Sequence, residues 1–284
     1  MRTIISSAAR TVTIGPDEPF VVIGERINPT GRKQLMAEMQ AGDLSRVRKD
    51  AVTQVEAGAH ILDVNAGVPG ADEAALLTKI VSEVLAVTDL PLCFDSANPA
   101  VLQAALSLYK GKPLINSVTG EDESLERVLP LVKKYNAAVV AMPNDRTGIQ
   151  MDPQGRLAVA RKIIQRASDY GIPAEDILID CQVMAVGADH RAGRATLDTI
   201  RLVSQELGNN TTIGASNVSF GLPDRPTLNV AFLTMAIASG LTCAITNPSA
   251  QETRKAIRAA DLLMGHDEYA MNYITGFRAD QAAA

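Results

Sequence analysis

The sequence predicts an α/β fold, a single (β/α)8 TIM barrel that spans residues 1–284. Short runs rich in β-branched and other apolar residues recur every ~20–35 residues, with stretches of helical periodicity between them. This alternation is typical of parallel strands joined by right-handed crossovers. No linker rich in Ser, Pro or Gly divides the chain, so we expect one domain.

Eight runs of this kind are expected to form the strands of the barrel. An open doubly wound sheet is the alternative fold, but it usually carries a GxGxxG turn after its first strand, and residues 24–31 read GERINPTG. The predicted strands are Phe20–Asn28, His60–Gly67, Pro91–Ser96, Pro113–Val118, Ala137–Pro143, Ile177–Val183, Thr211–Asn217 and Cys243–Asn247.

The helices between these strands are predicted from apolar residues that recur with a period of about 3.6 residues. One stretch places Val47, Ala51 and Val55 on its apolar face. Another places Ile163 on its apolar face and Arg156 on the opposite, charged face. Each apolar face is expected to pack against the strands, with the charged face in solvent.

Residues 226–251 carry no charge over 26 positions, and their length alone would allow a membrane span. Polar and turn-forming residues, among them Asn229, Ser239 and Pro248, interrupt the segment. We therefore expect a buried helix at about 227–239, a short strand at about 243–247, and no membrane contact.

Composition and charge exclude several classes of protein. The chain has 27 Lys and Arg against 32 Asp and Glu, a net charge of −5, and no basic run, which argues against binding to nucleic acid or to an anionic membrane. Cys93, Cys181 and Cys243 form no CxxC pair, so neither a disulfide framework nor a metal site is predicted. Residues 1–15 lack the apolar run of a secretion signal. These features favour a small-molecule partner and the reducing cytoplasm.

Polar side chains end nearly every predicted strand. In a (β/α)8 barrel these positions lie at the C-terminal mouth, where the loops build the active site. Capping of the following helix is the alternative role for each residue alone. Together they predict a neutral-to-acidic pocket for a flat ligand with several N–H donors. The residues are Glu25, Arg26, Asn28, Asp63, Asn65, Asp95, Ser96, Asn98, Asn116, Ser117, Asn144, Asp145, Asp180, Gln182, Ser216, Asn217, Ser219 and Asn247.

Six motifs occur along the chain at barrel spacing: GERIN, LDVNAG, CFDSAN, INSVTG, IDCQV and GASNVSFGLPDRP. In this order they resemble the pterin-binding methyltransferase family, whose members move a methyl group between methyltetrahydrofolate and a corrinoid. The resemblance runs from about Val21 to Met264 and includes the folate-binding region of cobalamin-dependent methionine synthase. Dihydropteroate synthase is similar in its barrel and pterin carboxylates, but its pyrophosphate substrate requires a basic, Ser-rich site that these motifs lack.

The resemblance implies roles for several strand-end residues. Asp180 is expected to accept hydrogen bonds from the N3–H and the exocyclic amine of the pterin, a donor pair that suits one carboxylate. Asp95 and Asn116 are expected to bind other ring nitrogens and the carbonyl. Glu25 and Arg26 are expected either to form a buried ion pair that braces the mouth or to contact the ligand. The remaining residues expected in the substrate site are Asp63, Asn65, Gln182, Ser216 and Ser219.

Asn217 is the expected catalytic residue. Displacement of N5 of methyltetrahydrofolate from the methyl carbon requires a proton on N5, because an amide anion is a very poor leaving group. The resemblance implies that the Asn217 amide hydrogen-bonds N5 and stabilises the charge that builds in the transition state. The alternative role is that of a turn residue after the seventh strand.

Further expectations concern partners and assembly. Residues 189–193 read DHRAG, which lacks the DxHxxG spacing that supplies a histidine to cobalamin, so the corrinoid is expected on a separate protein. The direction of methyl transfer stays open. The alternatives are a non-catalytic protein that binds reduced folate, and a dihydropteroate synthase-like enzyme. A homodimer is expected from the resemblance and from the apolar helix Ala256–Met264.

Overall fold

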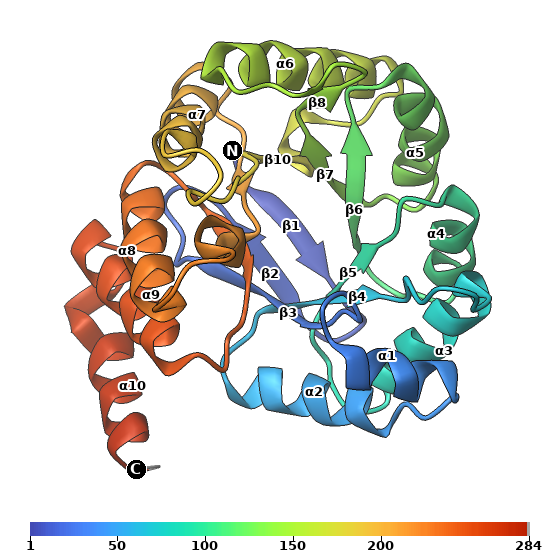
Figure 1. Cartoon of the computed structure of the whole chain (residues 1–284), viewed down its shortest axis with the longest axis horizontal. Coiled ribbons are helices and arrows are strands. Elements are labelled where there is room, and N and C mark those ends of the chain that lie inside the picture. Colours follow the sequence, from blue (N-terminus) through green and yellow to red (C-terminus); the bar gives the residue numbers. More distant parts are fainter. Residues whose placement is uncertain (283–284) are drawn as a thin grey trace.

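The computed structural model describes residues 1–282 and contains the predicted barrel. Eight parallel strands pair in the order β11-β10-β7-β6-β5-β4-β3-β12, and helices surround them (Figure 1). A parallel bridge between Gly214 and Ile245 joins the two ends of this sheet, with the Ile245 amide donating to the Ile213 carbonyl at 2.9 Å. The strands are β3 (Val21–Ile27), β4 (Ile61–Asn65), β5 (Leu92–Asp95), β6 (Leu114–Thr119), β7 (Ala138–Met142), β10 (Ile177–Asp180), β11 (Thr211–Thr212) and β12 (Cys243–Thr246).

The outer layer consists of helices that follow the strands along the chain. The uncharged segment forms one helix and one strand as predicted, and no helix within residues 1–282 has the length and apolar character that a bilayer crossing needs. The helices are α1 (Lys33–Gln40), α2 (Ser45–Glu56), α3 (Glu73–Leu85), α4 (Pro99–Leu106), α5 (Asp122–Lys134), α6 (Pro153–Asp169), α7 (Ala192–Glu206), α8 (Arg225–Ala238), α9 (Gln251–Met264) and α10 (Met271–Ala282), with short 3-10 turns η1 (Ala174–Asp176), η2 (Ala215–Ser219) and η3 (Glu268–Ala270).

The inside of the barrel changes from apolar to polar along the strand direction. Because side chains alternate between the two faces of a strand, the residue two positions after an inward-facing one also faces inward. Four buried apolar residues inside the barrel are each followed, two positions later, by a polar residue nearer the mouth. The pairs are Ile61 and Asp63, Cys93 and Asp95, Leu114 and Asn116, and Leu178 and Asp180.

A β-hairpin that the sequence did not predict closes the opposite end of the barrel. Strands β1 (Thr3–Ser6) and β2 (Thr11–Ile14) place Ile5 and Ile14, both fully buried, in the interior cluster. The Asn210 side chain, just before β11, donates to Thr3 Oγ1 and to the Ile14 carbonyl, each at 2.9 Å. In Figure 1 this hairpin crosses behind the centre of the ring of helices. It seals the barrel below the polar mouth.

Three other local features differ from the prediction. Strand β11 has only two residues, because the chain turns at Gly214 and continues into η2. A small hairpin of β8 (Asn144–Asp145) and β9 (Gly148–Ile149) follows β7 at the mouth. The prediction that Arg156 of α6 faces solvent is wrong, because its side chain is fully buried.

Candidate active site

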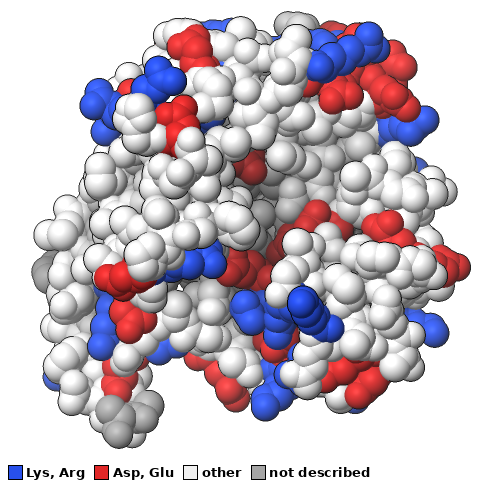
Figure 2. Space-filling model, viewed as in Figure 1, with Lys and Arg blue, Asp and Glu red and all other residues white. Residues whose placement is uncertain are grey.

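The mouth of the barrel is a hollow lined by acidic side chains, as Figure 2 shows at the centre of the face. The carboxylates come from Glu25 on β3, Asp63 on β4, Asp95 at the end of β5 and Asp180 at the end of β10. All four are buried or half-buried. The strand alternation therefore brings together the carboxylates that the sequence predicted as neighbours.

Two amide side chains hold the carboxylate of Asp95. Its Oδ2 accepts a hydrogen bond from Asn65 Nδ2 at 2.9 Å and a second from Asn28 Nδ2 at 3.4 Å. Burial raises the pKa of Asp95, and the hydrogen bond from Asn65 opposes that shift. Asn65 is itself oriented by the Gly67 amide, which donates to its Oδ1 at 2.7 Å. Asn65 thus acts here as a support for Asp95.

Asp63 is the most deeply placed acid of the mouth, with 2% of its surface exposed. Its Oδ1 accepts from Asn116 Nδ2 at 3.4 Å. Burial raises the pKa of Asp63 well above its usual value, and the negative charge of Asp95 raises it further. Two neighbouring carboxyl groups in one apolar setting resist ionising together. Of the two acids, Asp63 is therefore the one that loses its proton less readily.

Asp180 lies at the start of a sharp turn that also carries Gln182. Asp180 Oδ1 accepts from the Gln182 backbone amide at 2.8 Å, and Gln182 has a left-handed φ of 51°. Burial raises the pKa of Asp180 to about 6. Gln182 Nε2 donates to Asn144 Oδ1 at 3.2 Å, whereas no group within residues 1–282 donates to its buried Oε1. An unsatisfied buried acceptor at a mouth is suited to a ligand N–H.

The turn η2 carries the other predicted residues. Ser216 Oγ donates to Glu25 Oε2 at 2.9 Å, and burial raises the pKa of Glu25 despite this bond. Asn217 is exposed, and its amide lies over Gly214, where an added Cβ would approach Asn217 Nδ2 to 3.0 Å. The glycine therefore leaves the space that this amide occupies.

The hydroxyl of Ser219, another predicted site residue, is engaged by side chains of helix α8. It is fully buried, donates to Asn229 Oδ1 of α8 at 2.7 Å, and accepts from Arg225 Nε at 3.0 Å. Arg225 also donates from Nη2 to the Ser216 carbonyl at 2.8 Å, and its charge lowers the pKa of Glu25. The sequence interpretation missed Arg225, although it lies inside the GASNVSFGLPDRP motif.

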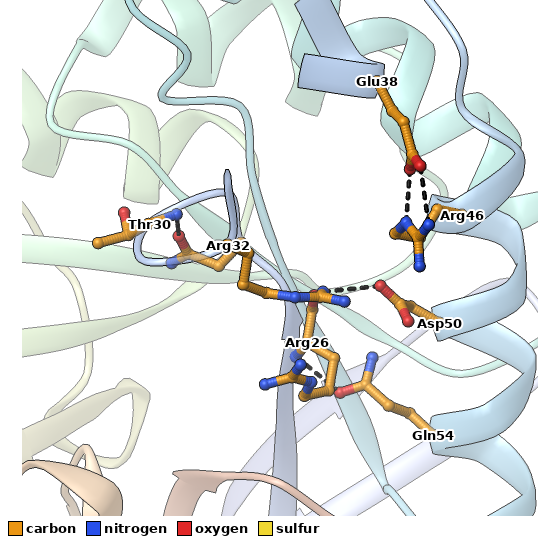
Figure 3. Close-up of polar contacts among 8 residues, drawn as sticks. Arg26, Thr30, Arg32, Glu38, Arg46, Asp50 and Gln54 are labelled. Atoms are coloured by element: carbon orange, nitrogen blue, oxygen red, sulfur yellow. Dashed lines mark hydrogen bonds and ion pairs between the residues drawn. The ribbon is translucent and has the colours of Figure 1, made fainter. Parts of the chain in front are cut away.

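The predicted ion pair between Glu25 and Arg26 does not form. Glu25 bonds to Ser216, while the Arg26 backbone amide donates to Gln54 Oε1 at 2.9 Å. Figure 3 shows Arg32 beside Arg26 on this side of the mouth. Arg32 Nη1 donates to the Arg26 carbonyl and to Asp50 Oδ2 of α2, the second contact at 2.7 Å. The loop after β3 is thus fixed to helix α2.

The mouth extends into a side cavity of about 330 Å3 between the β5 and β6 ends of the barrel. Asp95 and Asn116 form its inner wall, and Ser117, Thr119 and Pro99 are further lining residues. The volume is in the range of small-molecule sites. Within residues 1–282 no group of three His, Cys, Asp or Glu side chains is placed to hold a metal ion. The arrangement supplies hydrogen-bond acceptors and amides for a neutral or cationic heterocycle.

Comparisons with known proteins agree with this chemistry. Residues 24–247 match the family described as pterin binding enzyme. The chain is 31% identical over 267 residues to a methylcorrinoid:tetrahydrofolate methyltransferase of Eubacterium limosum, covering 91% of this chain and 96% of that protein. It is 33% identical over 258 residues to methionine synthase of Mycobacterium tuberculosis, covering 86% of this chain and 22% of that one.

The barrel is also similar to a solved dihydropteroate synthase of Xanthomonas albilineans. The TM-score is 0.64 at 22% identity, and the match covers 92% of this chain and 98% of the other. At this identity the likeness supports the fold, and the family rests on the sequence matches. The chain belongs to the pterin binding enzyme family.

Proposed function

We propose that this protein is a methyltransferase that moves a methyl group between N5 of tetrahydrofolate and the cobalt of a corrinoid on a separate protein. The proposal rests on one observation above others: the acidic mouth and the exposed Asn217 amide lie at the same end of the barrel. Similarity to the Eubacterium limosum methylcorrinoid:tetrahydrofolate methyltransferase supports it. Either direction of transfer is compatible, because one transition state governs both.

The residues at the mouth fit a pterin. Its N3–H and exocyclic amine form a donor pair, and the Asp180 carboxylate is the acceptor pair that we assign to them. Gln182 Oε1, which is buried and lacks a donor within residues 1–282, accepts a further N–H. Asp95 and Asn116, which line the side cavity, bind the other ring nitrogens and the carbonyl. Asp63, Asn65 and Ser216 hold these groups in place.

The exposed amide of Asn217 is assigned to N5. An amide can accept a hydrogen bond from protonated N5 or donate one to the neutral amine without ionising itself. Such a preorganised group stabilises the charge that develops as the N5–methyl bond breaks or forms. When docked, the corrinoid supplies the cobalt that accepts or donates the methyl group. The proton on N5 arrives through water and the polar groups around it.

An assay with purified protein tests the activity. Tetrahydrofolate and methylcobalamin are mixed with the protein under reducing conditions, and the cobalamin spectrum is followed. We expect protein-dependent demethylation of methylcobalamin, or the reverse reaction with methyltetrahydrofolate and Co(I) cobalamin. Pterin binding without transfer in either direction would instead favour a non-catalytic folate-binding protein. Formation of dihydropteroate from a pterin pyrophosphate and p-aminobenzoate would favour a dihydropteroate synthase-like enzyme.

The cytoplasm is the compartment that we propose. Cys93, Cys181 and Cys243 are free thiols buried in the barrel, and no disulfide forms among them. Proteins in oxidising compartments usually use cysteines as disulfides. Free buried thiols therefore favour a reducing compartment, which also suits a reduced folate.

We also propose a homodimer that forms through the C-terminal helices. The predicted interface helix is α9, but its Ala256, Ile257 and Ala260 side chains are buried, so only the end of the helix is available. Beyond them, Leu263 is 85% exposed and Phe277 of α10 is 54% exposed. Figure 1 shows α10 projecting from the barrel. A second copy is the partner that would cover this apolar surface.

Light scattering is expected to give twice the 30.1 kDa chain mass. Phe277→Glu should weaken association because it places a charge on the apolar surface. Lys79→Glu on α3 is the matched control, since that position lies on another helix. A monomer mass for the wild type over a wide concentration range would contradict the proposed dimer.

A further inference from the structure

Arg156 is a fully buried arginine at the beginning of helix α6. Its Nη1 donates to the backbone carbonyls of Cys181 at 2.7 Å and Gln182 at 2.9 Å. Its Nε donates to the carbonyl of Gln150 at 2.6 Å. One guanidinium thus connects helix α6, the turn after β10 and the segment that follows the β8–β9 hairpin.

No carboxylate forms an ion pair with this guanidinium within the described chain, and its buried Nη2 has no hydrogen-bond partner there. Burial of a charge costs free energy that a packed apolar residue at this position would avoid. Three backbone carbonyls compensate part of this cost here, so the segments that carry them are where the guanidinium acts.

The segment that Arg156 holds is the turn of the proposed pterin site. Gln182 adopts the left-handed conformation with φ 51°, which is unfavourable for a residue with a side chain. In the same turn the Gln182 amide donates to Asp180 Oδ1 at 2.8 Å. The Gln182 carbonyl also accepts a hydrogen bond from Thr196 Oγ1 of α7 at 3.1 Å.

We propose that Arg156 is a positioning residue for pterin recognition, which holds the turn after β10 so that Asp180 and Gln182 face the mouth. The inference rests on the proposed function for the identity of the ligand. Its effect is transmitted through backbone carbonyls, so Arg156 itself does not touch the ligand. The planar fork of arginine reaches the two successive carbonyls, which the single ammonium of lysine does less well.

The guanidinium also acts on the charge of Asp180. Its positive charge lowers the pKa of Asp180, against the larger effect of burial. The other titratable groups near this carboxyl are the thiols of Cys181 and Cys243, whose pKa values burial raises, so both are neutral near pH 6. Arg156 is therefore the charged group that shifts the ionisation of Asp180.

The test compares Arg156→Met with Arg156→Lys in the full chain. Equilibrium binding of tetrahydrofolate is measured from pH 5 to 8, and amide hydrogen exchange of Gln182 is measured without ligand. We expect Arg156→Met to weaken binding about 10-fold, as for loss of a charge-assisted hydrogen bond, and to move the pH midpoint of binding upward. Arg156→Lys should weaken binding and leave the midpoint in place, because the charge remains. Exchange at Gln182 should become faster in both variants.

Arg161→Met is the matched control, because Arg161 lies on the same helix with its side chain 51% exposed and pairs with Glu206. A folded Arg156→Met with wild-type affinity and midpoint would overturn the proposal. If Arg156→Met does not fold, wild-type affinity in Arg156→Lys would overturn it equally. Absence of tetrahydrofolate binding by the wild type would instead contradict the proposed function, and hydrogen exchange at Gln182 would still decide whether Arg156 holds the turn.

Discussion

Replacement of Asn217 by alanine is expected to lower turnover in methyl transfer by about 10²- to 10³-fold, the loss typical of one preorganised hydrogen-bonding group in a transition state. Affinity for the pterin should fall much less, because the amide acts chiefly while charge develops on N5. Asn217 is exposed, so its amide is accessible to a bound ligand. Steady-state kinetics with methylcobalamin or methyltetrahydrofolate measure both quantities.

Turnover across a range of pH tests whether Asn217 acts in the transition state or only contacts the bound ligand. An amide does not ionise, so the shape of the pH profile should be the same in Asn217→Ala as in the wild type. Asn272→Ala on α10 is the control, because that exposed side chain lies outside the mouth. Unchanged turnover would remove Asn217 from the mechanism. If turnover falls only in proportion to pterin affinity, Asn217 is a ligand contact and not a catalytic group.

Replacement of Asp180 by alanine is expected to weaken pterin binding by about 1.5–3 kcal/mol, which is about 10- to 150-fold. The variant removes the carboxylate that accepts the donor pair of the pterin. It also leaves the Gln182 amide without the acceptor that it has at 2.8 Å in the wild type. Isothermal titration with tetrahydrofolate measures the change. Asp169→Asn, at the exposed end of α6, is the matched control.

Binding by the wild type should depend on pH through Asp180. Burial raises the pKa of this carboxyl to about 6, so the ionised form dominates above that pH and the neutral form below it. The ionised form accepts the charge-assisted bonds. Affinity should therefore fall as the pH drops below about 6, and Asp180→Ala should lose much of this dependence. Equal affinity of variant and wild type would remove Asp180 from the site.

Local sequence patterns were sufficient to predict the barrel and most of its mouth. All eight strands occur where the apolar runs were recognised, because a buried parallel strand needs a continuous apolar run between turn signals. The site carboxylates followed from the same pattern. Asp63, Asp95 and Asp180 each come two residues after an inward-facing apolar residue. Residues two positions apart in a strand share a face, so these carboxylates also face inward.

The features that the sequence did not predict depend on contacts between segments that are distant along the chain. The hairpin β1–β2 is buried by residues more than 90 positions away, such as Lys112, whose carbonyl accepts from the Ser6 amide at 2.8 Å. Ser219 shares a motif with Asn217, yet its hydroxyl is directed to α8 by Asn229 and Arg225. A periodicity argument describes one segment at a time, so it has no information about such partners.

Arg156 illustrates the physical reason for this difference. Helical periodicity placed it on a charged face, because the argument assumes that a charged side chain stays in solvent. In the folded chain the carbonyl oxygens of Cys181 and Gln182 lie 2.7 and 2.9 Å from its guanidinium and replace part of its hydration. Periodicity along one element sets which way a side chain points, whereas only the assembled barrel determines which backbone groups it meets there.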